Sequence, residues 1–428
     1  MRQPVAPSVR SIAVTLIAAL SVLLAACGAR PDGAAAPAPV VRAGVPTDLL
    51  SVATANGALR IDTASGRTVV TLPGGAATPD WRRYWTTETA DLTSGAGGGP
   101  RTALRELDPT TGTELRTLVV DGRWAMPSRY GAAPDGFSID GSWLVLAAPQ
   151  ASAGGVTKSA FVVIDTVRAT VARTVVATGD LTFDAISADG RNLYVVEHLG
   201  APAQYRVRVA GGGGTALSVA PIVDLKVAAP QMNGLYHSSV ALPGGTWNYG
   251  LYFSPTKGAF IHALNASQLY AQCILDVPDG GPGVRPAWSM LLSPVGGHLY
   301  LVNGPAGMIA DVGPQSLRLE RKELRLVPAV ETTARRPVHG AAISPDGSRI
   351  YTVGEDGVLV ITTADLVLKA RYLPGTAVRS LALSPDGQRL YVLAEDGSLS
   401  RIDAATGKPN GTVALTARAT ALLRVTSP

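Results

Sequence analysis

The sequence predicts an all-β fold assembled from repeated four-stranded units, on the basis of three observations. A Ser-Pro-Asp-Gly turn phrase at residues 344–351 returns forty residues later at residues 384–391. Short apolar runs precede and follow each copy, and no helical periodicity separates the copies. Further turn dipeptides divide each repeat into segments of strand length.

The repeated phrase has the composition of a tight turn between two antiparallel strands. Proline presets the first backbone angle of a turn, aspartate bonds to its own backbone, and glycine accepts a positive φ. Exact and looser copies recur every 40 to 60 residues, beginning at Thr78, Ser138, Ser187, Pro243, Ser293, Ser344 and Ser384.

Two further turns complete each repeat. Asn56-Gly57 and Asp356-Gly357 are dipeptides favoured in two-residue hairpins, where both central residues need a positive φ. A strand with alternating aliphatic residues follows, as in residues 58–62. A third turn ends in glycine at Gly66, Gly112 and Gly407. The repeat therefore contains four antiparallel strands.

Four-stranded units at this spacing are typical of β-propeller blades. The turn phrases resemble those of the bacterial YVTN-type and quinoprotein-like propellers and, more distantly, of the WD-repeat propellers. The chain lacks the Gly-His and Trp-Asp pairs that mark true WD repeats. The resemblance covers residues 48–428 and implies a single propeller domain, with no specific activity attached to it.

The two ends of this domain predict how the ring closes. Residues 49–53 read as a second strand without a first, and residues 419–425 read as a first strand without followers. Pairing them gives one composite blade and hides two strand edges. Seven markers plus this blade give eight blades, and a ring of seven is the alternative if residues 81–122 are not a full blade.

The N-terminal residues predict export and lipidation. Arg2 and Arg10 precede an apolar run at residues 12–26, which is too short to cross a bilayer but suits a secretory signal. Residues 24–28, Leu-Ala-Ala-Cys-Gly, resemble the bacterial lipobox, which implies cleavage before Cys27 and acylation of that residue. We expect a signal at residues 1–26 and an Ala/Pro/Gly tether at residues 27–47. The predicted location is the extracytoplasmic face of a cell membrane. In an organism with two membranes the sequence is compatible with the outer one and leaves the choice between inner and outer membrane open.

Charge and cysteine content exclude several classes. Removing two arginines with the signal leaves 35 basic and 32 acidic residues, a formal charge of +3 without basic runs, so nucleic acid is not an expected partner. Cys273 is then the only cysteine besides Cys27, and we expect it to be a small core residue sharing a strand face with Ala271 and Leu275.

The common catalytic motifs for serine hydrolases, zinc proteases and phosphate-binding loops are missing from the sequence. Counting back five residues from each marker, with Leu242 in the serine position of blade five, nevertheless gives a candidate ligand-binding ring at one mouth of the channel: His237, Trp288, His339 and Arg379. Arginine suits an anion, tryptophan offers a stacking surface, and histidine binds metals or transfers protons. The alternative is that these large residues plug the channel mouth.

These features predict a membrane-anchored binding or scaffold module of the bacterial cell envelope, whose partner is an envelope protein or a small ligand. No cofactor and no metal is predicted. The alternative function is an enzyme, either a lactonase-like hydrolase or a quinone-dependent dehydrogenase, since both activities occur on similar propellers.

Overall fold

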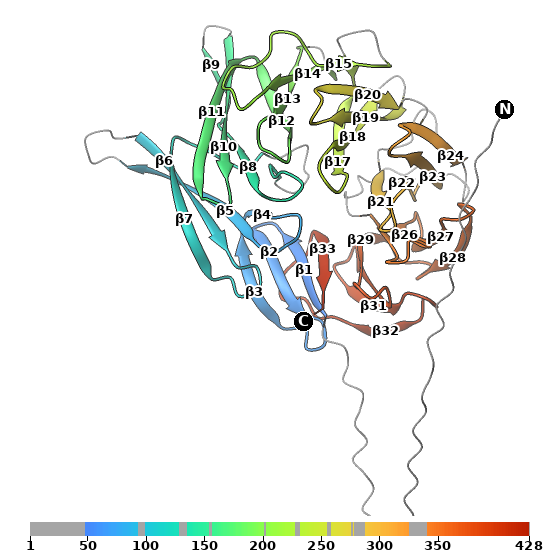
Figure 1. Ribbon diagram of the computed structural model, residues 1–428. Coiled ribbons are helices and arrows are strands. Elements are labelled where there is room, and N and C mark those ends of the chain that lie inside the picture. Colours follow the sequence, from blue (N-terminus) through green and yellow to red (C-terminus); the bar gives the residue numbers. More distant parts are fainter. Residues whose placement is uncertain are drawn as a thin grey trace, which may run out of the picture. The chain divides into compact units, whose positions relative to one another are not determined.

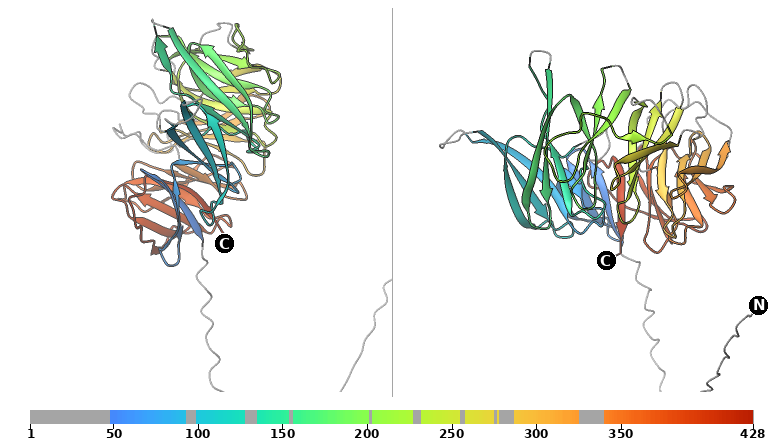
Figure 2. Two further views of the ribbon diagram at one scale, coloured as in Figure 1. Left: turned by 90° about the vertical axis from the view of Figure 1, so that its left-hand side faces the viewer. Right: turned by 45° about the horizontal axis from the view of Figure 1, so that its top comes forward.

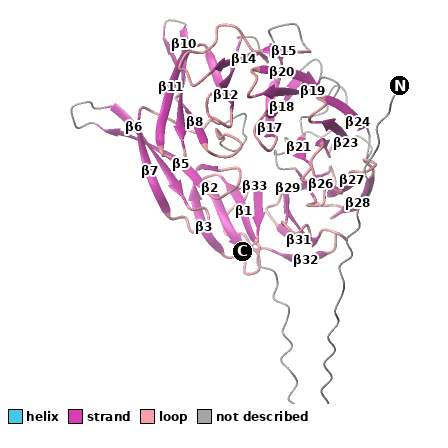
Figure 3. Cartoon of the chain, viewed as in Figure 1, coloured by secondary structure: helices cyan, strands magenta, loops and turns pink. Residues whose placement is uncertain are grey.

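The computed structural model describes residues 48–92, 99–127, 135–153, 156–200, 203–226, 232–254, 258–274, 277, 287–324 and 340–427. The chain divides into two units, Met1–Val45 and Pro46–Pro428. The predicted signal, Cys27 and the tether lie outside the described residues, as does His339. Strands and loops, without a helix, make up the part of the chain that is described (Figure 3).

The second unit is an eight-bladed β-propeller, which confirms the larger of the two predicted blade numbers (Figure 1). The blades are essentially antiparallel sheets that surround a central axis, with the first strand innermost except in blade 3 (Figure 2). Blade 1 comprises β33 (Ala421–Thr426), β1 (Leu49–Thr54), β2 (Gly57–Asp62) and β3 (Thr68–Pro73), and blade 2 comprises β4 (Gly75–Ala77), β5 (Tyr84–Leu92), β6 (Gly99–Leu107) and β7 (Glu114–Asp121). Blade 3 comprises β8 (Trp143–Ala147), β9 (Ala151–Ala153), β10 (Val156–Asp165) and β11 (Thr170–Thr178). Blade 4 comprises β12 (Asp180–Ile186), β13 (Leu193–His198), β14 (Gln204–Ala210) and β16 (Met232–Asn233).

Blade 5 comprises β17 (Leu235–Ala241), β18 (Trp247–Ser254), β19 (Gly258–Asn265), β20 (Tyr270–Ile274) and β15 (Val223–Asp224). Blade 6 comprises β21 (Ser289–Leu292), β22 (Leu299–Asn303), β23 (Met308–Gly313) and β24 (Arg318–Leu324). Blade 7 comprises β25 (Ala341–Ile343), β26 (Arg349–Val353), β27 (Val358–Thr362) and β28 (Leu368–Tyr372), and blade 8 comprises β29 (Val378–Leu383), β30 (Arg389–Ala394), β31 (Leu399–Asp403) and β32 (Pro409–Thr412).

Two blades depart from the predicted four-strand pattern. In blade 3 the innermost position is held by two isolated bridges, Ala125 to Ala147 and Phe137 to Leu144, in place of a continuous strand. In blade 5 the short strand β15 pairs in parallel with β20 and adds a fifth strand. β15 belongs to the long connection that follows β14 of blade 4, so this connection reaches across to the neighbouring blade.

All seven predicted marker phrases form the same turn between the first and second strands. In the exact copies, the Gly347 and Gly387 amides both donate to the carbonyl oxygen of the serine three residues earlier, at 2.8 Å. The serine hydroxyl donates to the following aspartate at 2.5 Å in Ser344 and 2.6 Å in Ser384. Leu242 makes the corresponding backbone bonds with Gly245 and Trp247, which confirms that it holds the serine position in blade 5.

Tyrosines early in the second strand connect successive blades. Their hydroxyls donate to carbonyl oxygens in the third turn of the next blade: Tyr194 to Ala266 at 2.8 Å, Tyr249 to Pro314 at 2.5 Å, and Tyr351 to Ala404 at 2.9 Å. Apolar clusters fill the space between the same sheets, so each blade packs on its neighbours. This nearest-neighbour packing lets a long chain fold without one large central core.

The ring closes as the sequence predicts, by pairing the C-terminal strand β33 with β1. Asp48, directly before β1, accepts hydrogen bonds from Arg389 Nε at 2.6 Å and Arg389 Nη2 at 3.0 Å, and from the Tyr391 hydroxyl at 2.7 Å. Arg389 and Asp48 are both buried. Asp48 thus joins blade 1 to blade 8 by a buried ion pair.

Candidate functional site

The innermost strands carry bulges that re-aim single side chains. The pairing register skips one residue on the inner strand of blades 4, 5 and 8, and the extra residues are Asp184, His237 and Arg379. A bulged residue is left outside the ladder and its strand bends, which is one way proteins direct a side chain at a functional site. Blade 1 has the same irregularity at Leu423.

Two of the four predicted ring residues therefore occupy equivalent bulges. His237 is half-buried, and its Nδ1 lies 3.2 Å from the Ser238 hydroxyl. Arg379 pairs with Glu395, with Nη2 to Oε2 at 2.6 Å and Nε to Oε2 at 3.0 Å. The Arg379 and Glu395 side chains are 23% and 37% exposed, so this ion pair remains accessible to a charged ligand.

Trp288 has a different environment from His237 and Arg379. It precedes β21, is 1% exposed and belongs to the apolar cluster between blades 5 and 6. Its ring packs among aliphatic side chains, which fits the alternative of a large residue filling space better than a stacking surface for a ligand. His339, the fourth predicted ring residue, lies outside the described residues.

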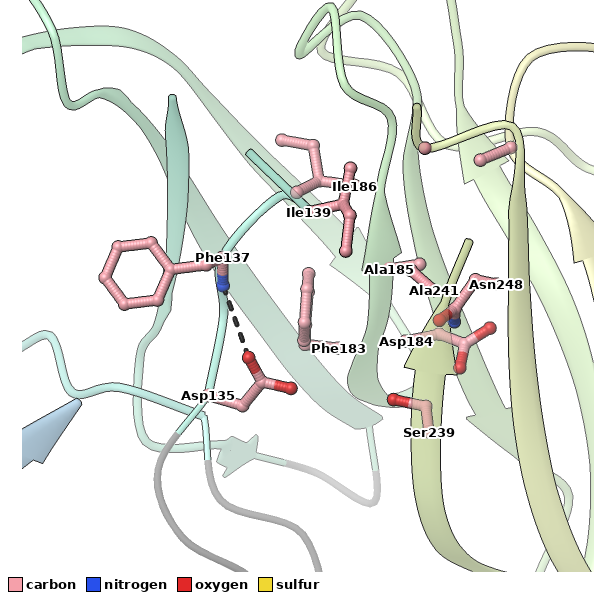
Figure 4. Close-up of a pocket in the computed structure, with 12 residues that line it drawn as sticks. Asp135, Phe137, Ile139, Phe183, Asp184, Ala185, Ile186, Ser239, Ala241 and Asn248 are labelled. Atoms are coloured by element: carbon pink, nitrogen blue, oxygen red, sulfur yellow. Dashed lines mark hydrogen bonds between the residues drawn. The ribbon is translucent and has the colours of Figure 1, made fainter. Parts of the chain in front are cut away.

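A pocket lies against the inner strands of blades 3, 4 and 5 and encloses about 400 Å³ of space, part of it open to solvent. Its lining is mixed, with the carboxylates of Asp135 and Asp184, the Ser239 hydroxyl and the Asn248 amide set among apolar side chains. Figure 4 shows the Phe183 ring between Asp135 and Asp184, with Ser239 on the Asp184 side. Asp135 Oδ1 accepts a hydrogen bond from the Gly136 amide at 2.7 Å, which fixes one carboxylate at the pocket wall.

Asp184 is the site residue that sequence reasoning missed. Counting five residues back from the marker of blade 4 gives Thr182, which lies 3.1 Å from His198 Nε2, whereas the bulge falls two residues later. The available signal was a charged residue within the apolar run of residues 181–186. Asp184 is 5% exposed, and a carboxylate so deeply buried in an inner strand is uncommon without a local role.

These features define the chain as an eight-bladed β-propeller with acidic, basic and imidazole side chains at bulges in its innermost strands. No protein-family model matches the sequence. No curated protein matches it either.

Solved structures show the same architecture at low sequence identity. Dihydro-heme d1 dehydrogenase NirN matches with a TM-score of 0.50 and 14% identity over 89% of this chain and 75% of that chain. AztD from Citrobacter koseri matches with a TM-score of 0.50 and 12% identity over 89% of this chain and 98% of that chain. The periplasmic gluconolactonase PpgL of Pseudomonas aeruginosa is 18% identical over 80% of this chain and 98% of that chain, with a TM-score of 0.41. At these identities the two matches with a TM-score of 0.50 establish the propeller fold alone.

Among the described residues, no helix is long and apolar enough to cross a membrane.

Proposed function

We propose that this chain is a binding or scaffold module of the bacterial cell envelope, a lipid-anchored propeller that recruits a partner or ligand at the channel mouth. The observation that carries the proposal is the set of polar bulge residues, Asp184, His237 and Arg379, on a ring of blades joined by hydrogen bonds. A rigid scaffold holds such side chains in fixed positions, which lowers the entropy cost of binding.

The chemistry of the bulges favours an anionic or zwitterionic ligand group. Arg379 presents a guanidinium that binds carboxylates or phosphates through two parallel hydrogen bonds. Its present partner, Glu395, lies in a partly exposed ion pair, which contributes about 0 to 1 kcal/mol and is therefore easily exchanged. His237 and His339 are the further proposed contacts, while Trp288 supports the strand from the core.

A cross-linking experiment in cells tests the binding proposal. A photoreactive residue replaces Thr182, the third residue of the inner strand β12 of blade 4. The cross-linked species are then compared between the parent chain and a His237→Ala/Arg379→Ala variant. We expect a discrete cross-linked species that disappears in the double variant, with an unchanged melting temperature. Arg371→Ala is the matched control, because Arg371 forms a comparable ion pair with Asp356 at 3.3 Å on the outer strand β28. A species that persists in the double variant, or no species at all, contradicts the proposal.

The anchor is tested separately. The Cys27→Ala variant should lose a metabolically incorporated fatty-acid label and move from the membrane fraction to the soluble fraction, because acyl chains supply the membrane affinity. Folding of the propeller should be unaffected. Retention of the label in the variant contradicts lipidation at Cys27.

A further inference from the structure

The interface between blades 4 and 5 buries an unusual group of polar side chains. His262 on β19 is 4% exposed, and Cys273 on β20 is fully buried. The Asp224 side chain on β15 is 8% exposed. These residues lie beside the apolar cluster that holds Tyr205 and Tyr252. Polar groups are rarely buried together unless they hydrogen-bond or share a ligand.

Strand register brings the three side chains together. His262 and Cys273 are direct partners across the β19–β20 ladder, so their side chains project from the same face of the sheet. Asp224 pairs in parallel with Ala271, two residues before Cys273 and therefore on that same face. The added fifth strand of blade 5 is thus what supplies the carboxylate.

The donor atoms lie close enough for one ion. One ligand atom from each of Asp224, His262 and Cys273 falls within 4.8 Å of the other two. His262 Nε2 lies 3.9 Å from Asp224 Oδ2, while the Lys226 amide holds Asp224 Oδ1 at 2.9 Å. Zinc ligands at about 2.0 to 2.3 Å from the metal lie roughly 3.3 to 3.8 Å from one another in a tetrahedron. A contraction of about 1.5 Å at most in any donor–donor distance would therefore close the site.

A fourth potential ligand, the soft thioether sulfur of Met232, lies beside the cluster. Met232 Sδ, at the start of β16, is 4.0 Å from Cys273 Sγ. Thiolate and thioether sulfur with imidazole nitrogen suit thiophilic transition metals and disfavour Ca²⁺ and Mg²⁺, which prefer oxygen ligands.

The Tyr205 hydroxyl is a second, independent sign of an incomplete polar site. It is buried and has no hydrogen-bond partner among the described residues. Its ring centroid lies 6.3 Å from that of His262, which places it beside the cluster.

We propose that Asp224, His262 and Cys273 form a buried site for one Zn²⁺ ion, with the Met232 thioether as an adjacent soft donor. Binding forms a Zn–S bond and breaks the Cys273 S–H bond, releasing one proton to solvent. The ion fastens the connection containing β15 to the outer strands of blade 5. Zinc would then set the strength of the blade 4–blade 5 contact.

A second cluster, His298, Asp311 and Glu320, provides an internal comparison. Its donor atoms also lie within 4.8 Å of one another. Arg321 Nη2, however, already pairs with Asp311 at 2.7 Å, and His298 Nδ1 lies 3.0 Å from the same carboxylate. A resident guanidinium supplies the positive charge that a metal would bring, so we expect no zinc there.

Zinc titration of the purified full-length chain tests the proposal, in a Cys27→Ser background that leaves Cys273 as the only thiol. We expect one Zn²⁺ per chain, release of about one proton, and a raised melting temperature. Co²⁺ in place of Zn²⁺ should give thiolate-to-cobalt charge-transfer absorption. Failure of the parent chain to bind either ion saturably overturns the proposal, whatever the variants do.

Variants assign the ligands. Cys273→Ser should abolish the charge-transfer absorption, and His262→Gln should lower zinc affinity by at least about tenfold. His298→Ala, in the comparison cluster, should leave stoichiometry and affinity unchanged. If His298→Ala removes binding while Cys273→Ser does not, the site is elsewhere and the proposal is wrong.

Discussion

The two clearest copies of the turn phrase, residues 344–351 and 384–391, differ at two of eight positions and build the same turn, but they have different roles in the ring. In both, the amide of the following arginine donates to the serine hydroxyl at 2.9 Å. Arg349 is exposed, whereas Arg389 is 8% exposed and bonded to Asp48. Nearly identical local sequence thus specifies the same local turn, while the neighbouring blade decides what each side chain contacts.

The difference arises at the seam of the ring. Tyr351 donates to the Ala404 carbonyl of the next blade, while Tyr391, at the same position one repeat later, donates to the Asp48 carboxylate and the Thr63 hydroxyl. Blade 1 takes its first strand from the C-terminus, so no turn phrase leads into β1, and Asp48 stands where that phrase would end.

Replacing Arg389 and Arg349 separately should give the largest difference in stability between the two turn phrases. Arg389→Ala leaves the Asp48 carboxylate buried without its cation and should lower the free energy of unfolding by about 3 to 5 kcal/mol. Arg349→Ala should cost about 1 kcal/mol or less, because that side chain is exposed. Chemical denaturation of both variants measures the difference. Equal losses would show that the seam has no special role.

Glycine replacements separate backbone strain from packing within blade 8. Gly387 has φ +71° and an added Cβ would lie 2.7 Å from Pro345 Cδ of the preceding blade, whereas Gly397 has φ +91° and open space around it. Both alanine variants incur a left-handed backbone cost of about 1 to 2 kcal/mol. Gly387→Ala should therefore be the less stable in thermal unfolding. If the two melt alike, the turns do not pack tightly against one another.

In the turn of blade 2 a glycine can be introduced instead of replaced, and this substitution should stabilise the fold. Trp81 holds the glycine position of its marker and has φ +62°, a strained conformation for a bulky residue. Trp81→Gly should stabilise the fold by up to about 1 kcal/mol, because glycine adopts this conformation without strain. Denaturant midpoints give the sign directly, and a destabilised variant would mean that contacts of the tryptophan ring outweigh the strain.

The smallest expected effect is a pH dependence at the turn of blade 7. The Ser344 hydroxyl, then the Ser348 amide and hydroxyl, lower the pKa of Asp346 from 3.8 to about 2. Because the folded-state pKa is depressed, its contribution is present above about pH 4 and is lost as the pH falls toward 2. Wild-type stability should exceed that of Asp346→Asn at pH 5, and the gap should close by about pH 2. The group is exposed, so the gap is small. A gap that does not change with pH would exclude this carboxylate as its source.

Local patterns predicted most of the fold because each depends on neighbours in sequence. The marker turns, the composite closing blade and the buried strand position of Cys273 follow from turn chemistry and alternation within a few residues. The parallel strand β15 gave no such signal, since two paired residues are too few to show a period. The count from the markers located His237 and Arg379 but not Asp184, because it assumes equal strands and a bulge can occur anywhere along a strand.

The sequence by itself determined that this chain is a ring of repeated four-stranded blades, because turns and alternation are encoded over short distances. The tertiary structure alone decided which polar groups meet. Asp48 lies 341 residues from Arg389, and Asp224, His262 and Cys273 come from three different strands. Such meetings depend on register and on the packing of one blade against the next, and no local pattern specifies either.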